Sequence, residues 1–213
     1  MEYFLLFCVL LIGGLKAKDF FASSDDGLVE KAKKGNRAAF DELYNKYKRP
    51  ILNYIYRLIG DLSQAEELTQ ETFIRVYTNI GRYVKKGKFS SWVYAIAGNL
   101  AKNFLRDTSY VTEVSIDKEI QEEQKGKITL LDVIADKTKG PDKETLKKET
   151  ERLIQRGLNK LKPKHKDVII LCDIEGLSYG EVARILKCRP ATVGSRLSRA
   201  RENLARILGI LKE

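Results

Sequence analysis

Five side chains near the end of the chain have the chemistry that proteins use to bind DNA. Residues 178–204 read SYGEVARILKCRPATVGSRLSRARENL. The second half of this segment places hydroxyl and guanidinium groups at helical spacing: Thr192, Ser195, Arg196, Ser198 and Arg199. An arginine can donate two hydrogen bonds to O6 and N7 of guanine, and short hydroxyl side chains let a helix approach base edges and phosphates. Together with Arg189, these residues are the candidate contacts to duplex DNA.

Two short helices joined by a tight turn are expected to position these side chains. Ser178 can cap the first helix, and Glu181 can close a capping box three residues later. Lys187-Cys188-Arg189 forms the turn, and Pro190 can begin the second helix. This is a helix-turn-helix pattern, and the alternative is an ordinary helical hairpin with a solvated basic face. Charge favours DNA binding, because residues 187–212 contain seven basic residues and one acid.

A second group of polar and aromatic side chains lies in two upstream segments. The segment AEELTQETFIRVYTNI (65–80) places polar side chains on a helix face that packing in a core would not require. In KFSSWVYAIAGNLAKNFLRD (88–107), aromatic residues alternate with lysine, asparagine and arginine. Aromatic rings beside cations can stack on exposed bases while the cations neutralise phosphates. Core packing explains part of this set, including Trp92 and Ile96.

The hydrophobic pattern predicts an all-α protein with two small helical domains. Apolar residues recur at helical spacing from Leu28 to about Arg106, and again from residue 141 almost to the end. Runs of alternating β-branched residues with Asn-Gly turns are missing, so a sheet is not expected. Residues 107–140 are polar and lack a sustained period, which predicts a flexible linker. The expected division is therefore an apolar extension (1–27), a helical bundle (28–106), the linker (107–140) and a C-terminal domain (141–213).

Composition limits the classes of function. The formal net charge of +10 favours binding to a polyanion, either nucleic acid or an anionic membrane surface. The three cysteines are too widely spaced for a disulfide framework, and the single histidine belongs to no zinc-binding pattern. Such cysteine usage suits a reducing cytoplasm. No nucleophile–base pair or cluster of metal-binding carboxylates is apparent, so we expect no catalysis, metal or cofactor.

The chain resembles the extracytoplasmic-function (ECF) sigma factors, compact two-domain members of the sigma-70 family of bacterial transcription initiation factors. Three segments in the expected order carry the resemblance: AEELTQETF, FSSWVYAIAGNLAKNFLR and LKPKHKDVIILCDIEGLSYGEVARILKCRPATVGSRLSRAR. It covers both predicted domains and implies that they are the region 2 helical bundle and the region 4 helix-turn-helix of that family. It also implies a protein that binds core RNA polymerase, directs it to promoters and opens DNA without ATP, a small-molecule substrate or catalytic residues.

The resemblance implies a role for each group of side chains. The AEELTQETF helix would dock on the clamp helices of the largest polymerase subunit through Glu67, Leu68, Gln70, Glu71 and Phe73. The following loop and helix would recognise the −10 element and hold a flipped base through Lys85, Lys86, Lys88, Phe89, Trp92, Asn99, Lys102 and Asn103. The −35 element would be read through Arg189, Thr192, Ser195, Arg196, Ser198 and Arg199. Further implied partners are the flap of the second-largest subunit and an anti-sigma factor, through which a cytoplasmic protein would associate with the membrane.

Two positions depart from the pattern of the family. Gly194 stands where a basic residue is usual and Ala95 where arginine is common, so each promoter element loses one expected contact. Gly98 and Gly194 also lie within expected helices, where glycine costs about 1 kcal/mol relative to alanine. A close approach of another part of the chain would justify them.

Two alternative functions are a one-component DNA-binding regulator and a membrane-tethered protein. A one-component regulator with the same helix-turn-helix would bind duplex DNA alone as a symmetric dimer. A membrane-tethered protein is suggested by residues 3–15, thirteen uncharged residues reading YFLLFCVLLIGGL. A spanning helix needs about 20 residues, and the preceding flank lacks the lysine or arginine of a signal peptide. The stretch is therefore a translation artefact, an apolar helix packed on the protein or a partner, or a weak tether.

Overall fold

The computed structural model describes residues 25–84, 87–115 and 143–209, with side chains up to residue 108 and again from residue 149. Every regular element in these ranges is a helix, which confirms the all-α prediction. The N-terminal bundle consists of α3 (Asp26–Lys33), α4 (Arg37–Ile59), α5 (Leu62–Asn79), the 3₁₀ turn η1 (Ile80–Arg82) and α6 (Phe89–Ser115). The C-terminal bundle consists of α8 (Lys143–Asn159), α9 (Pro163–Ile169), the π-helical turn η3 (Ile170–Ile174), α10 (Tyr179–Ile185) and α11 (Pro190–Ile207).

Local capping signals fix the ends of the helices in the N-terminal bundle. The Asn36 side chain accepts a hydrogen bond from the Ala39 amide and begins α4. Gly60 ends this helix with φ of 86°, in the left-handed region that favours glycine. Asp61 then caps α5 by accepting from the Gln64 amide. The sequence GD therefore both ends one helix and starts the next.

Helix α6 is longer than predicted and packs closely on α4. It continues beyond Arg106 to Ser115, into the segment that the sequence predicts to be linker. Its central glycine, Gly98, is required by packing. A β-carbon at Gly98 would lie 2.7 Å from the buried hydroxyl oxygen of Tyr54.

The helix-turn-helix forms as the sequence predicts. Ser178 and Glu181 complete both hydrogen bonds of the capping box that begins α10. Lys187 adopts φ of 50° in the turn, and Pro190 is the first residue of α11. The apolar side chains Val193 and Leu197 are buried and hold α11 against the rest of the bundle.

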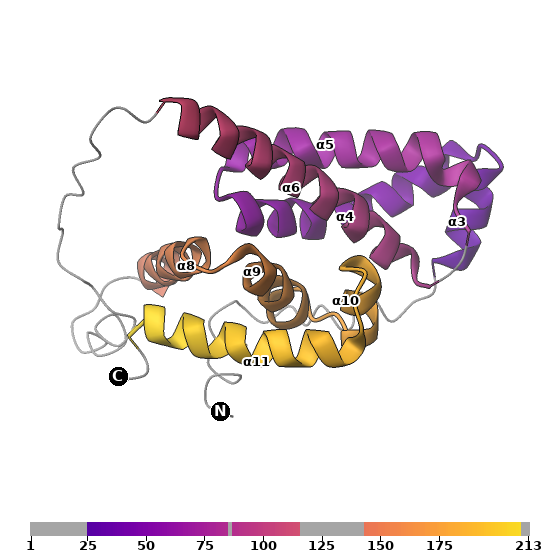
Figure 1. Cartoon of the computed structure of the whole chain (residues 1–213). Coiled ribbons are helices and arrows are strands. Elements are labelled where there is room, and N and C mark those ends of the chain that lie inside the picture. The colour runs from indigo at the N-terminus through magenta and orange to yellow at the C-terminus, as the bar shows by residue number, and fades with distance from the viewer. Residues whose placement is uncertain (1–24, 85–86, 116–142, 210–213) are drawn as a thin grey trace.

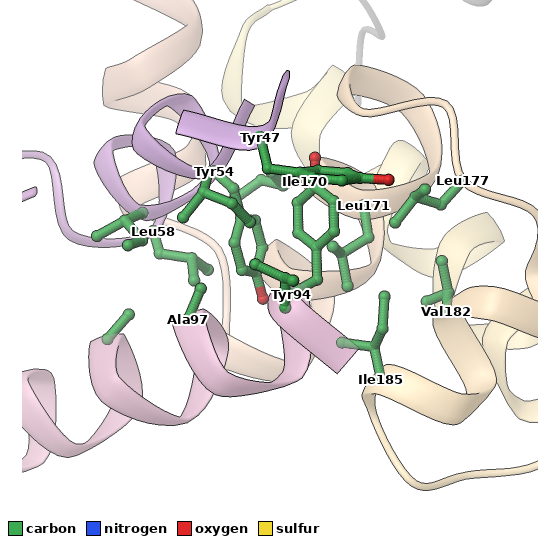
Figure 2. Packing of buried hydrophobic residues seen from close by; sticks show 14 of the residues in the cluster. Tyr47, Tyr54, Leu58, Tyr94, Ala97, Ile170, Leu171, Leu177, Val182 and Ile185 are labelled. Atoms are coloured by element: carbon green, nitrogen blue, oxygen red, sulfur yellow. The ribbon is translucent and has the colours of Figure 1, made fainter. Parts of the chain in front are cut away.

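The two bundles pack directly on each other, which the sequence did not predict. Figure 1 shows the C-terminal bundle beneath the N-terminal one, with α10 against α6 and α8 against α4. One hydrophobic core runs through both bundles. In Figure 2, Tyr54 from α4 and Tyr94 from α6 lie beside Ile170 and Leu171 from η3, and all four are buried.

Candidate nucleic-acid and polymerase interfaces

The outer face of α11 carries the side chains predicted to contact duplex DNA. Arg189, Ser195, Ser198 and Arg199 are exposed, whereas Thr192 and Arg196 are half-buried. The buried residues on the opposite face keep this polar face turned outward. The helix can therefore present hydroxyl and guanidinium donors to a groove without disturbing its own packing.

Arg201 lies on the inner side of the same helix and has a different role. Its Nε and second terminal nitrogen donate to the two carboxylate oxygens of Asp173, at 2.9 and 2.6 Å. This bidentate pair raises the pKa of Arg201 and ties α11 to η3. One of the seven basic residues counted in the C-terminal segment therefore stabilises the fold.

Gly194 is not required by packing, unlike Gly98. A β-carbon at Gly194 would lie 3.6 Å from the ring of Tyr179, an ordinary contact distance. The Tyr179 ring is exposed beside this position. A side chain at residue 194 would fit, so the missing basic residue reflects no constraint of the fold.

The residues predicted to bind polymerase are distributed over the surface and core of α5. Glu67 and Gln70 are exposed, and Leu68 and Glu71 are half-buried. Phe73 is buried at 5 % exposure, with its ring 4.8 Å from that of Tyr44. Phe73 therefore supports the helix from beneath and does not present a surface.

Two apolar residues on the same helix were missed by sequence reasoning. Ile74 and Tyr77 are 57 % and 56 % exposed and lie three residues apart on one face of α5. The sequence does carry a signal for their exposure, because neither residue falls in the helical register of the buried residues Phe73 and Val76. Together with Gln70 they make an exposed face of mixed polarity.

The predicted −10 residues lie on or before α6, in varied surroundings. Asn99 and Asn103 are exposed, whereas Phe89 is buried. Trp92 is half-buried, and its ring packs 4.9 Å from that of Tyr83 and 5.7 Å from that of Phe89. The two lysines Lys85 and Lys86 lie outside the described residues.

Lys88 and Lys102 are engaged by carboxylates of the C-terminal bundle. Lys88 Nζ lies 3.0 Å from Glu181 Oε1, and Lys102 Nζ lies 2.8 Å from Asp167 Oδ2. Burial raises the pKa of Asp167, and the adjacent Lys102 opposes that effect. These contacts join residues far apart in the chain, so no local sequence pattern predicts them.

A buried hydrogen bond lies at the centre of the same interface. The Tyr94 hydroxyl donates to Glu175 Oε2 at 2.6 Å, and both residues are buried. Burial raises the pKa of Glu175 from 4.5 to about 7, although Tyr94 and Arg57 favour its ionised form. At the edge, Arg57 and Gln155 exchange two hydrogen bonds of 3.3 and 3.2 Å between the bundles.

Comparison with known proteins assigns both bundles to one family. Residues 43–110 match Sigma-70 region 2, and residues 151–204 match Sigma-70, region 4. The RNA polymerase sigma-H factor of Pseudomonas aeruginosa is 32% identical over 185 residues, which cover 86% of this chain and 93% of that protein. The ECF RNA polymerase sigma factor SigW of Bacillus subtilis is 33% identical over 180 residues, covering 84% and 94%. The chain belongs to the ECF sigma factors of the sigma-70 family.

This sigma factor directs RNA polymerase to promoters and, like its family, is non-catalytic. Its fold is similar to two solved structures. CnrH in complex with the cytosolic domain of CnrY has a TM-score of 0.65 and 19% identity, covering 89% of this chain and 100% of that one. The sigma factor RpoE in complex with the anti-sigma factor NepR, from Bartonella quintana, has a TM-score of 0.60 and 20% identity, covering 81% and 98%.

The apolar opening stretch lies outside the described residues, so its predicted nature stays a prediction. Among the helices of the described ranges, none is both long enough and apolar enough to span a bilayer.

Proposed function

We propose that α11, α6 and α5 divide the work of promoter-specific initiation in this sigma factor. The α11 face would read the −35 element in the major groove through Arg189, Thr192, Ser195, Arg196, Ser198 and Arg199. The observation that carries the proposal is the outward polar face of this helix. It is held by a buried apolar face, and the helix follows the capped helix α10 after a tight turn. Arginine and hydroxyl donors in this arrangement suit base edges and phosphates.

The α6 helix and the loop before it would bind the non-template strand at the −10 element. Asn99 is exposed to hold a flipped base, and Trp92, seven residues earlier on the same helix, offers a half-buried ring. Lys88, Lys102 and Asn103 would contact phosphates, while Phe89 supports the loop from the core. Flipping a base costs a few kcal/mol of unstacking, and a pocket that reads its edge offsets that cost.

The α5 face would dock on the clamp helices of the largest polymerase subunit. Glu67 and Gln70 supply exposed polar contacts, and Leu68 and Glu71 lie partly exposed beside them. The exposed pair of Ile74 and Tyr77 extends this face with apolar area suited to the centre of a protein interface. The C-terminal bundle would also contact the flap of the second-largest subunit.

An anti-sigma factor is the further partner that we propose, in a cytoplasmic protein. Two similar folds are those of proteins bound to CnrY and to the anti-sigma factor NepR, and the CnrY part is a cytosolic domain. Affinity capture of the full chain from its native cells, followed by mass spectrometry, tests this partner. Recovery of core polymerase alone would count against it.

Reconstitution with core polymerase tests the proposed function as a whole. The holoenzyme should transcribe specifically from a promoter that core enzyme alone ignores, and the free chain should shift duplex promoter DNA weakly. A symmetric dimer that binds duplex DNA tightly without polymerase would instead support the one-component regulator. Failure to bind core polymerase would reject the proposed function.

A further inference from the structure

We infer that Tyr83 is a positioning residue for −10 recognition, whose hydroxyl group fixes the loop between η1 and α6 before DNA binds. The Tyr83 hydroxyl donates to the backbone carbonyl of Gly87 at 3.2 Å, four residues later in the chain. In this role Tyr83 acts through the backbone of the loop and the ring of Trp92, and not by contact with DNA. The inference rests on the proposed role of α6 and its preceding loop in binding the −10 strand.

The loop is fixed at its first residue by the turn η1. The Tyr83 amide donates to the Ile80 carbonyl at 3.1 Å and closes this turn. Ile80 is buried at 5 % exposure, so the turn is anchored in the core of the N-terminal bundle. The Tyr83 side chain therefore leaves the backbone at a defined place, and the orientation of its ring decides where the hydroxyl lies.

Two aromatic rings of α6 set that orientation. The centroid of the Tyr83 ring lies 4.9 Å from that of Trp92 and 5.7 Å from that of Phe89. Phe89 is buried, and its ring lies 5.8 Å from that of Tyr47 on α4, so the bundle supports this aromatic cluster. Aromatic pairs at such separations prefer particular relative orientations. Packing requires only the ring at position 83, so the hydroxyl group has the separate role of holding the loop.

The far end of the loop is joined directly to the first turn of α6. Lys88, which is among the residues proposed to contact strand phosphates, follows Gly87. Its carbonyl accepts from the Ser91 amide at 3.1 Å as the helix begins. The bond from Tyr83 to Gly87 therefore fixes both ends of the loop relative to the helix that carries Asn99.

A loop that is fixed in advance binds a strand at a lower entropic cost. A loop that moves freely in the unbound protein loses backbone freedom when DNA binds, and this loss weakens affinity. The bond from Tyr83 restricts the loop beforehand, so less freedom is lost in the complex. The neighbouring side chain of Val84 is 67 % exposed, so the restricted loop stays accessible to a strand.

Binding of a fluorescent single-stranded oligonucleotide to preformed holoenzyme tests the role of the hydroxyl. The oligonucleotide carries the non-template −10 sequence of a promoter that the holoenzyme transcribes. Tyr83→Phe removes the hydroxyl and keeps the ring, and we expect it to weaken binding about three- to tenfold. Tyr56→Phe, at a half-buried position on α4, is the matched control and should bind like the unmodified chain. Equal affinity of Tyr83→Phe and the unmodified chain would overturn the inference.

A second oligonucleotide separates positioning from a general effect on the fold. It has an abasic site in place of the flipped base, so the loop and Trp92 have no base to hold. The loss caused by Tyr83→Phe should be smaller with this oligonucleotide, and thermal melting by circular dichroism should match that of the unmodified chain. An equal loss with both oligonucleotides would show that the hydroxyl does not act through the base, which contradicts the inference.

Asn99→Ala distinguishes failure of this inference from failure of the proposed function. If Asn99→Ala weakens binding of the base-bearing oligonucleotide and Tyr83→Phe does not, only the inference fails. If neither variant changes binding, the proposed role of α6 in −10 recognition fails as well.

Discussion

The polar faces of α11 and α6 carry similar side chains in different surroundings. On α11, Arg199 and its neighbouring hydroxyl residues are exposed beside a buried apolar face of the same helix. Just before α6 and within it, Lys88 and Lys102 face carboxylates of the other bundle. The comparison teaches that two surfaces with similar chemistry can differ in their partners within one fold. The α11 residues face outward, whereas the two lysines are paired with carboxylates of the C-terminal bundle.

The largest expected effect distinguishes base reading from phosphate binding. Arg199→Ala in holoenzyme should lower promoter-specific transcription about 10- to 100-fold, because a bidentate arginine–guanine contact contributes about 1–3 kcal/mol of discrimination. Arg206→Ala is the control, since Arg206 lies toward the end of α11 and pairs with Glu202 at 2.6 Å. Measured transcription from one promoter should change for the first variant and not for the second.

A pH titration tests the contact between the two bundles, where Glu175 is buried. The pKa of Glu175 is about 7 in the folded chain and near 4.5 when unfolding exposes the group, so the folded state binds the proton more tightly. Its contribution to stability is greatest below pH 4.5 and is lost as the pH rises through the window from 4.5 to about 7, by on the order of 3 kcal/mol. Urea unfolding across this window should show the decline, and Glu175→Gln should flatten it.

Gly98 of α6 and Gly194 of α11 provide the next test, one in each helix that is proposed to bind DNA. Gly98→Ala should lower the free energy of unfolding by about 1–3 kcal/mol, because the new β-carbon meets a fully buried tyrosine. Gly194→Ala should raise it by up to about 1 kcal/mol, because the position has room and alanine favours helix. Urea denaturation of both variants measures the pair, and equal effects would contradict the packing described for Gly98.

The smallest effect is expected from a single phosphate contact on α6. Lys102→Ala in holoenzyme should reduce affinity for promoter DNA by a similar factor whatever the base sequence and lower the salt dependence by about one unit of slope. A titration of open-complex stability against salt concentration gives both quantities. A loss confined to one promoter sequence would show that Lys102 reads bases.

Local features of the fold were predictable because each depends on a few neighbouring residues. The capping box of Ser178 and Glu181, the start of α11 at Pro190 and the break at Gly60 and Asp61 all follow from backbone hydrogen bonding and allowed φ angles. The outward set on α11 follows from the apolar period of the same helix.

Long-range features were not predictable from one sequence. Tyr94 and Glu175 are 81 positions apart, and nothing near either residue identifies the other as its partner. The role of Arg201 was obscured for the same reason, because its pair with Asp173 depends on how α11 packs on η3. Phe73 was placed on a docking surface by resemblance, whereas its burial depends on contact with Tyr44.

The most direct test of the division between α11 and α6 is paired footprinting of holoenzyme on one promoter. DNase protection reports duplex binding at −35, and permanganate reactivity of thymines reports strand opening at −10. We predict that Asn99→Ala keeps protection at −35 and loses reactivity at −10. Arg199→Ala should lose protection at −35. Normal opening by Asn99→Ala together with full −35 protection by Arg199→Ala would contradict the account.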